Sequence, residues 1–183
     1  MELKNWEGEV LNFWFKELTP KQWFISSPEG DELIKNRFHD LVIKLADDLP
    51  EDTKSSVDKS LAAILCFDQF TRNIFRGQAQ AFSYDHLALS LSQHIIEMGW
   101  DKEMDNPHKQ FTYMPLMHSE DINVQKQSLV MFRAFDDDIF KFAQDHHDII
   151  ETYGRYPHRN ECLGRQSTPE ELEYLKDAQR FGQ

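Results

Sequence analysis

The chain has 183 residues, of which 40% are hydrophobic and 28% are charged, and its formal net charge is −12. This length fits one domain spanning residues 1–183, and the apolar and aromatic content excludes disorder of the whole chain. An acidic chain repels phosphate backbones, and the longest apolar run, residues 61–67, is too short to cross a bilayer, so we expect neither nucleic-acid nor membrane binding.

The cysteine content and the N-terminal residues indicate a cytoplasmic protein. Cys66 and Cys162 are too few for a disulfide framework and do not have the spacing of a metal knuckle. The first residues show no basic region followed by an apolar run, so we expect no signal peptide. Motifs that bind nucleotides or metals are missing as well, and we therefore expect neither a cofactor nor a metal.

Apolar residues in the N-terminal third follow helical spacing. Leu11, Trp14 and Leu18 favour a helix over a short strand. From residue 31 to residue 49 apolar residues recur every three or four positions. Pro50 follows them, which predicts an amphipathic helix that ends there.

The stretch from residue 57 to residue 75 differs from its neighbours. Residues 61–67 are apolar on every side, which predicts a helix buried at the centre of the fold. The preceding residues 51–56 are polar and predict a loop within the domain.

The C-terminal half repeats the amphipathic pattern. Residues 87–98 and residues 139–153 carry apolar residues at helical spacing, and a glycine follows each run as an expected helix end. Further along, Thr168 predicts a helix cap, with Pro169 at the first helical position and Glu171 completing a capping box.

The middle of the chain predicts two helix starts with a break between them. Asn106, followed by a proline, predicts a start, and Pro115 is expected to break the helix that follows. Ser119 would cap the next helix. Glu120 and Asp121 would then lie in its first turn, where the helix dipole favours acids.

These patterns together predict an all-α fold of about seven to nine helices. We find no convincing strand pair and no hairpin turn of the Asn-Gly or Asp-Gly type. No internal repeat is legible at the periods of about 34 to 40 residues that helical arrays show.

A charged stripe continues from the buried helix. Asp68, Arg72 and Arg76 are spaced by four and share one helix face, and Asn73 lies among them. Charges that emerge from a buried helix need partners. One interpretation is an internal Asp68–Arg72 ion pair that ties helices together. The other is that Arg76 lines a cavity that accepts an anion.

Residues 153–165 form a second basic cluster. Arg155, Arg159, Arg165 and His158 fall within eleven residues that contain one acidic residue. Five of the eight arginines of the chain lie in these two motifs. Arginine forks match carboxylates and phosphates, and the glycines and proline of the segment would fix its shape. The alternative is that these arginines cap helix ends.

His118 has a structural and a functional interpretation. Structurally, it ends one helix before the capped start of the next. Functionally, it is an acid–base group in the same cavity, with a carboxylate such as Asp121 to orient it. His146 falls on an apolar stripe, which is more typical of a hydrogen-bonded core histidine. Cys162 lies four residues after His158, but nothing else supports it as a nucleophile.

The order and length of these motifs resemble one bacterial family. The motifs that carry the resemblance are residues 10–15, 68–77, 81–85, 118–121 and 154–171. They are similar to the family known as domain of unknown function 924, over about residues 9 to 182. The resemblance implies an all-helical fold, a helical-hairpin array similar to tetratricopeptide repeats, and it implies no particular reaction.

The resemblance also carries motif positions. Thr71 stands where the family often has proline, and Cys162 departs from the motif, which further weakens its interpretation as a nucleophile. The positions that match family motifs are Asp68, Arg72, Asn73, Arg76, His118, Asp121, His158, Arg159, Asn160 and Arg165.

The leading hypothesis is a concave site on which the two arginine motifs converge. It would bind a small anionic ligand with a carboxylate or phosphate group, or the C-terminal carboxylate of a peptide. Arg76, Arg159 and Arg165 would contact the anion, while Asp68 would orient Arg72. The full ligand-binding set is Arg72, Asn73, Arg76, Arg155, Arg159, Asn160 and Arg165.

Two alternatives belong to other classes of protein. In the first, the chain is a hydrolase or transferase in which His158 or His118 is the acid–base group and arginines stabilise negative charge. Asp121 or Asp68 would orient that histidine. In the second, the Asp–Arg pairs are structural, and an exterior face of a monomer or dimer binds other proteins. A histidine within about 3 Å of a carboxylate and facing a cavity would favour the enzyme.

Overall fold

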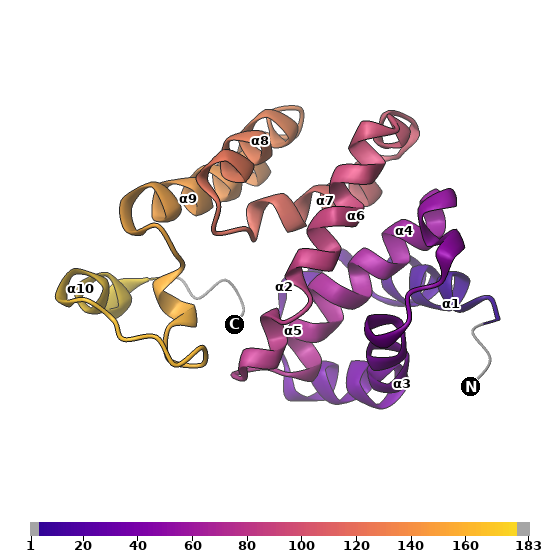
Figure 1. The fold of residues 1–183 in the computed structure, drawn as a ribbon, viewed down its shortest axis with the longest axis horizontal. Helices are drawn as coiled ribbons and strands as arrows, with labels where there is room; N and C mark the ends of the chain where they lie inside the picture. Colours follow the sequence, from indigo (N-terminus) through magenta and orange to yellow (C-terminus); the bar gives the residue numbers. More distant parts are fainter. Residues whose placement is uncertain (1–3, 179–183) are drawn as a thin grey trace.

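Residues 4–178 form a succession of helices joined by short loops in the computed structural model that describes them (Figure 1). Within this described part no strand occurs, so the all-α prediction is confirmed. The helices are α1 (Trp6–Asn12), α2 (Pro20–Phe24), α3 (Pro28–Asp47), α4 (Val57–Ile64), α5 (Thr71–Ile74), α6 (Asp85–Glu97), α7 (Asn106–Met117), α8 (Ile122–Phe132), α9 (Asp137–Tyr153) and α10 (Pro169–Asp177).

A continuous helical rod, residues 57–74, forms the centre of the fold. It consists of α4, a wider π-helical turn at Leu65–Phe70, and α5. When α4 and α5 are counted as one helix, the described residues contain nine, which agrees with the expected seven to nine. Residues 60–72 of the rod are all buried, as the uninterrupted apolar run predicted.

Aromatic side chains fill the space around the rod. Phe70 is fully buried, and its ring centroid lies 4.7 Å from that of Phe38 in α3. Its centroid also lies 5.6 Å from Trp14 and 5.9 Å from Phe13, both in the N-terminal helical segment. One side chain of the rod therefore joins α3 and the N-terminal segment through buried aromatic contacts.

Helices that follow one another in the sequence also pack against one another. α6 packs against α4 and α7, α7 packs against α8, and α8 packs against α9. α1 and α3 cover the rod. In Figure 1, the C-terminal helices α8 to α10, in orange and yellow, form one side of the molecule, while α1 and α3 form the other.

The predicted helix ends of the C-terminal half are confirmed. Gly99 and Gly154 follow α6 and α9, each with a φ of 70°, a left-handed conformation that glycine adopts without strain. At the start of α10, the Thr168 hydroxyl accepts from the Glu171 N–H, and the Glu171 carboxylate accepts from the Thr168 N–H. This is the expected capping box.

The expected helix break at Pro115 is wrong, because Pro115 lies inside α7. The two residues after it, Leu116 and Met117, are buried in an apolar cluster with α8 and α9. Burial of these side chains outweighs the loss of the one backbone hydrogen bond that proline cannot donate, because it has no N–H, so the helix continues through it.

Two predicted caps are also displaced. Asp105 rather than Asn106 caps α7, since the Asp105 side chain accepts from a backbone N–H of the first turn. Asp121 rather than Ser119 caps α8, where its carboxylate accepts from the Asn123 N–H at 2.7 Å. Asp121 therefore lies at the cap and not in the first turn, because its carboxylate is the better acceptor for the exposed N–H groups.

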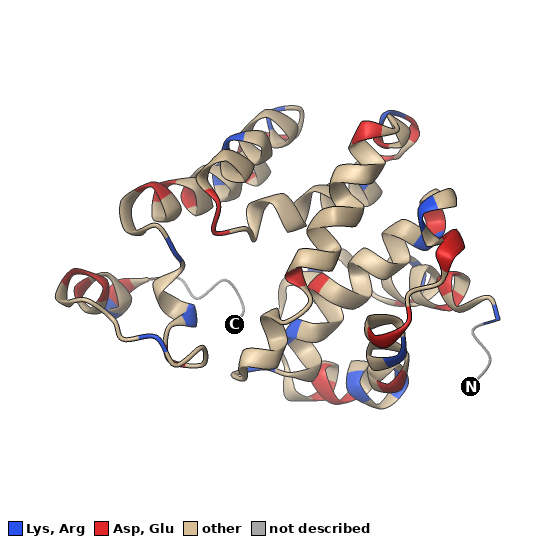
Figure 2. Ribbon diagram, viewed as in Figure 1, with Lys and Arg blue, Asp and Glu red and all other residues tan. Residues whose placement is uncertain are grey.

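Asp and Glu residues occur on many elements of the fold. Figure 2 shows these positions in red on α3, α9 and α10 and in the loops near the rod. Among the described residues, no helix is both long enough and apolar enough to span a membrane. Cys66, buried in the rod, and Cys162 are free thiols.

Replacing Phe70 with alanine tests the aromatic contacts of the rod. We expect Phe70→Ala to lower the free energy of unfolding by about 3–5 kcal/mol, because it removes contacts with three buried rings and leaves a cavity. Urea unfolding followed by circular dichroism measures this change. Val130, which is 71% exposed, provides the control, and Val130→Ala should change stability by less than about 0.5 kcal/mol. Equal losses in both variants would contradict this description of the core.

A candidate active site between α2, the rod, α7 and α9

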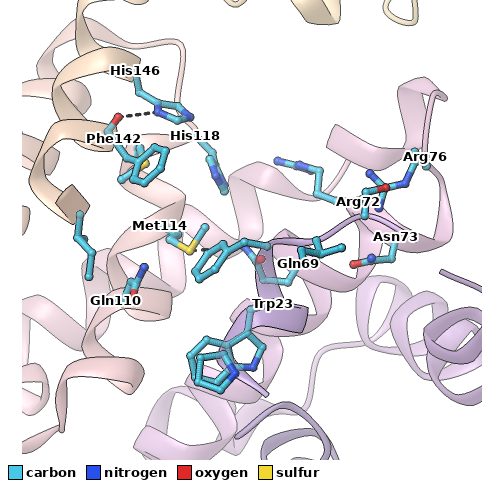
Figure 3. Close-up of a pocket in the computed structure, with 16 residues that line it drawn as sticks. Trp23, Gln69, Arg72, Asn73, Arg76, Gln110, Met114, His118, Phe142 and His146 are labelled. Atoms are coloured by element: carbon cyan, nitrogen blue, oxygen red, sulfur yellow. Dashed lines mark hydrogen bonds between the residues drawn. The ribbon is translucent and has the colours of Figure 1, made fainter. Parts of the chain in front are cut away.

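A cavity of about 570 Å³ lies between α2, the rod, α7 and α9 (Figure 3). This volume is in the range of sites that bind small molecules. Figure 3 shows His118 and Arg72 reaching toward one another from two sides of the pocket, with Trp23 on the α2 side. The lining thus combines residues that the sequence singled out with aromatic residues that it did not.

A histidine–aspartate pair forms part of the pocket wall. His118 follows the last residue of α7, and its Nδ1 lies 2.6 Å from Oδ1 of Asp68. Asp68 is fully buried in the rod, whereas His118 is 9% exposed and lines the pocket. Because a carboxylate accepts hydrogen bonds, the neutral ring donates its proton from Nδ1 to Asp68. The lone pair of Nε2 is then available to a molecule in the pocket.

Asp68 is held through both of its oxygens. Gln69 donates from Nε2 to Oδ2 at 2.5 Å, and the Arg72 guanidinium lies 3.8 Å from Oδ1. Burial would raise the pKa of Asp68, but His118, Arg72 and the hydrogen bonds hold it below its usual value. Asp68 is therefore an anion that orients the His118 ring.

The π-helical turn at residues 65–70 positions these groups. Such turns are wider than α-helical turns and are frequent at functional sites. Two adjacent residues of this turn reach the site. Asp68 contacts His118, and Gln69 lines the pocket. Thr71 follows the turn and donates from its hydroxyl to the carbonyl oxygen of Phe67 at 2.8 Å.

The two arginine motifs meet at Asp85. Arg72 lies 2.8 Å from the Asp85 carboxylate, and Arg159 lies 3.5 Å from it. Both guanidinium carbons are 4.6 Å from the centre of the Phe82 ring. Arg159 also donates to the His118 carbonyl oxygen at 3.1 Å. The motifs therefore converge on a carboxylate of the protein itself, and Asp85 is a nearer partner of Arg72 than Asp68.

Arg159 is a buried part of this network and does not line the pocket. It is 4% exposed, and its guanidinium carbon lies 4.4 Å from the centre of the Tyr156 ring. Burial and the like charge of Arg72 lower the pKa of Arg159 to about 10, although Asp85 opposes the shift. Arg159 therefore stays charged at neutral pH and holds the C-terminal motif against the end of α7.

Arg155 and Arg165 form ion pairs outside the pocket lining. Arg155 binds Glu171 through contacts of 2.6 and 2.8 Å, and Arg165 binds Glu120 through contacts of 2.7 and 2.9 Å. Asn160 links the two pairs, accepting from Arg165 and donating to Glu171. These contacts pin α10 and the loop before α8 to the C-terminal motif, which fits the structural interpretation of these arginines.

Arg76 and Asn73 do line the pocket, but a carboxylate already binds both. Asp31 of α3 accepts from Arg76 at 2.6 and 2.8 Å and from Asn73 at 2.8 Å. Burial would raise the pKa of Asp31, yet these contacts hold it below its usual value. Asp31 is 45 positions from Arg76, and no pattern in the sequence connects them.

The other two acid–base candidates lie elsewhere. Asp121 is exposed and caps α8. The ring of His158 lies 5.4 Å from that of Tyr156, and His158 is not part of the pocket lining. Of the candidate pairs, the described structure brings His118 and Asp68 within hydrogen-bond distance at the pocket.

His146 of α9 lines the pocket, although no feature of the sequence marks it as part of a site. Its Nδ1 lies 2.7 Å from the Phe142 carbonyl oxygen, and its ring centre lies 6.1 Å from that of His118. Burial and the neighbouring His118 lower the pKa of His146 to about 3, so its ring is uncharged. Its position on an apolar stripe predicted a hydrogen-bonded core histidine, and His146 is hydrogen-bonded and 5% exposed.

The remaining wall is apolar and partly open to solvent. Phe24 of α2 and Phe142 of α9 are about half exposed, and both line the pocket. Trp23 packs on Phe111 with 5.2 Å between ring centres, and its Nε1 donates to the Trp14 carbonyl oxygen at 2.7 Å. These contacts fix α2 in place. Exposed apolar side chains that gather at a cavity are typical of a ligand site.

One group of metal-ligand residue types lies outside the pocket. The potential ligand atoms of His147, Asp148 and Glu151 on α9 are within 4.8 Å of one another. Asp148 and Glu151 are exposed, and exposed acidic residues commonly gather without an ion. Among the described residues, no other group of three potential metal ligands lies this close together. None of the three residues lines the pocket.

The Glu171 ion pair predicts a pH dependence of stability. Arg155, with Thr168 and Asn160, lowers the pKa of Glu171 from 4.5 to about 2. Because the folded-state pKa is lowered, the stabilisation is complete above the unfolded value of 4.5 and is lost as the pH falls toward 2. We therefore expect wild type and Glu171→Gln to converge in free energy of unfolding across this window, measured by urea unfolding. A difference that is independent of pH would contradict this expectation.

The sequence and the structure of the chain are both similar to those of known bacterial proteins. The sequence profile of a family described as bacterial protein of unknown function, DUF924, matches residues 10–179. The solved structure of a protein of unknown function, ATU0120 from Agrobacterium tumefaciens, is similar with a TM-score of 0.89 and 33% identity. That similarity covers 94% of this chain and 97% of that chain. A search of curated proteins finds no match. Because the profile spans most of its length, the chain belongs to the DUF924 family of bacterial proteins.

Proposed function

We propose that the protein is an acid–base enzyme of the hydrolase class, in which His118 is the base and Asp68 orients it. The observation that carries this proposal is the 2.6 Å contact between His118 Nδ1 and the fully buried Asp68 at the wall of a cavity. A carboxylate at one ring nitrogen and an open pocket at the other is the arrangement that a general base requires.

Water is the nucleophile that suits this site. Cys66 is buried in the rod, and Cys162 lies 3.2 Å from the Arg159 carbonyl oxygen, with neither in the pocket lining. In the proposed reaction, His118 Nε2 takes a proton from water while the water oxygen bonds to the electrophilic centre of the substrate. When the leaving group departs, the imidazolium returns that proton to its oxygen. The sum is hydrolysis, and no other reactant is consumed.

The residues around His118 support the changes of charge in this reaction. Asp68 stabilises the imidazolium that forms beside it. Arg72 lines the pocket, and its positive charge would stabilise the oxygen on which negative charge develops. His146 is uncharged, so it does not repel the imidazolium electrostatically.

Binding without turnover is the second candidate, and Arg72, Asn73 and Arg76 in the lining favour it. The protein would then bind a small anionic ligand or a peptide carboxylate, and His118 would contribute affinity alone. In both candidates the C-terminal arginines serve the fold, because burial and ion pairs with neighbouring carboxylates occupy them.

Substitution of His118 separates the two candidates. We expect His118→Gln to lower kcat for ester hydrolysis by about 10²–10⁴-fold, because the general base is lost. Release of p-nitrophenol from a panel of p-nitrophenyl esters measures the rate. His86→Gln is the matched control and should keep the wild-type rate, since His86 is an exposed histidine of α6 outside the pocket.

Thermal unfolding of both variants checks that each is folded before the rates are compared. If His118→Gln hydrolyses esters as fast as His86→Gln, His118 is not the base. If the wild type hydrolyses none of the esters while His118→Gln weakens binding of a small anionic ligand, the binding candidate is supported and the acid–base enzyme is rejected.

A further inference from the structure

We infer that the substrate is a neutral ester of an apolar monocarboxylic acid and not a phosphate compound. This substrate class rests on the hydrolase function proposed above and narrows it. The charge balance of the pocket, its apolar wall and its volume each point to this class.

Each arginine that lines the pocket already faces a carboxylate. Arg76 is bound by Asp31 at 2.6 and 2.8 Å. Arg72 is bound by Asp85 at 2.8 Å and has Asp68 3.8 Å away. An incoming anion would have to compete with these carboxylates for both guanidinium groups.

The formal charges of this ion-pair network also cancel, because Asp31, Asp68 and Asp85 stand against Arg72, Arg76 and Arg159. A phosphate monoester carries about −1.5 to −2 charges at neutral pH. To bind Arg72 or Arg76 in the lining, it would have to displace Asp85 or Asp31 and leave that largely shielded carboxylate without its partner, which is unfavourable.

A neutral ester matches this balance at each stage of hydrolysis. Bound substrate adds no charge to the ion pairs around the pocket. When water adds to the carbonyl carbon, the carbonyl oxygen gains one negative charge and His118 gains one positive charge. The two charges arise together in one cavity, so the reaction adds no net charge while Arg72 and Asp68 stabilise the separated pair.

The apolar wall suits the acyl part of such an ester. Phe24 of α2 is 54% exposed and Phe142 of α9 is 49% exposed, and both line the pocket next to Trp23 and Ile139. An acyl chain lying on this wall would remove apolar surface from water on both partners. The cavity of about 570 Å³ has room for an acyl chain of several carbons beside the carbonyl group.

The test compares hydrolysis of p-nitrophenyl acetate, butyrate, hexanoate and octanoate with that of p-nitrophenyl phosphate by the full chain. We expect kcat/KM to rise about fourfold for each acyl methylene that the pocket buries, and we expect no hydrolysis of the phosphate. Phe142→Ala should flatten the dependence on chain length. Met98→Ala should leave it unchanged, because Met98 is exposed to a similar degree, at 54%, and lies outside the pocket.

A binding measurement keeps the substrate class separate from the reaction. The neutral alcohol 1-octanol, which carries the same chain without a charge, is titrated against wild type and Phe142→Ala, with tryptophan fluorescence as the readout because Trp23 lines the pocket. If 1-octanol binds and Phe142→Ala weakens its binding while no ester is hydrolysed, the apolar ligand class stands and the hydrolase proposal fails.

Other outcomes overturn the substrate class. Hydrolysis of acetate and octanoate esters at equal rates, or of the phosphate in preference, with loss of the rate in His118→Gln, would leave the acid–base function standing and reject an apolar acyl substrate. Absence of both hydrolysis and 1-octanol binding would reject both proposals.

Discussion

The hydrogen bond between Asp68 and His118 is the contact on which the site depends. It joins the central rod to the end of α7 and determines which nitrogen of the neutral ring carries the proton. Asp68 is removed from water, so neighbouring groups must stabilise its charge. Gln69, the next residue, and Arg72, one turn further along the same rod, do so. This requirement explains why a polar stripe follows directly on an apolar helix, and the groups that stabilise the buried carboxylate also hold the histidine at the pocket.

The second arginine motif supports the first without reaching the pocket lining. Arg159 binds Asp85 together with Arg72 and donates to the carbonyl oxygen of His118, so it holds the end of α7 in place. Arg155 and Arg165, in the same motif, bind α10 and the loop before α8 through Glu171 and Glu120. A motif outside the pocket lining therefore supports the geometry of the site, and residue type alone does not separate a ligand-binding arginine from a structural one.

Local features of the fold were predictable from the sequence, whereas the connections within the site were not. Helical periodicity and capping involve residues a few positions apart. Most predictions built on them are confirmed, but tertiary burial carries α7 through Pro115, and Asp105 and Asp121 replace the predicted caps Asn106 and Ser119. Asp68 and His118 were both candidates, but they are 50 positions apart and their pairing follows from packing of α7 on the rod. Arg155 and Arg165 suited an anion by type, and only the fold shows that carboxylates of the chain already bind them.

In the proposed reaction, Asp68 makes Nδ1 of His118 the protonated nitrogen and leaves Nε2 as the base. Long-range ¹H–¹⁵N correlation spectra of the neutral ring measure this directly, because the two nitrogens differ in chemical shift according to which one carries the proton. We expect protonated Nδ1 and unprotonated Nε2 in the wild type, with a shift toward the other tautomer in folded Asp68→Asn. A proton on Nε2 of His118 in the wild type would contradict the account, since the nitrogen that faces the pocket could not then accept a proton from water.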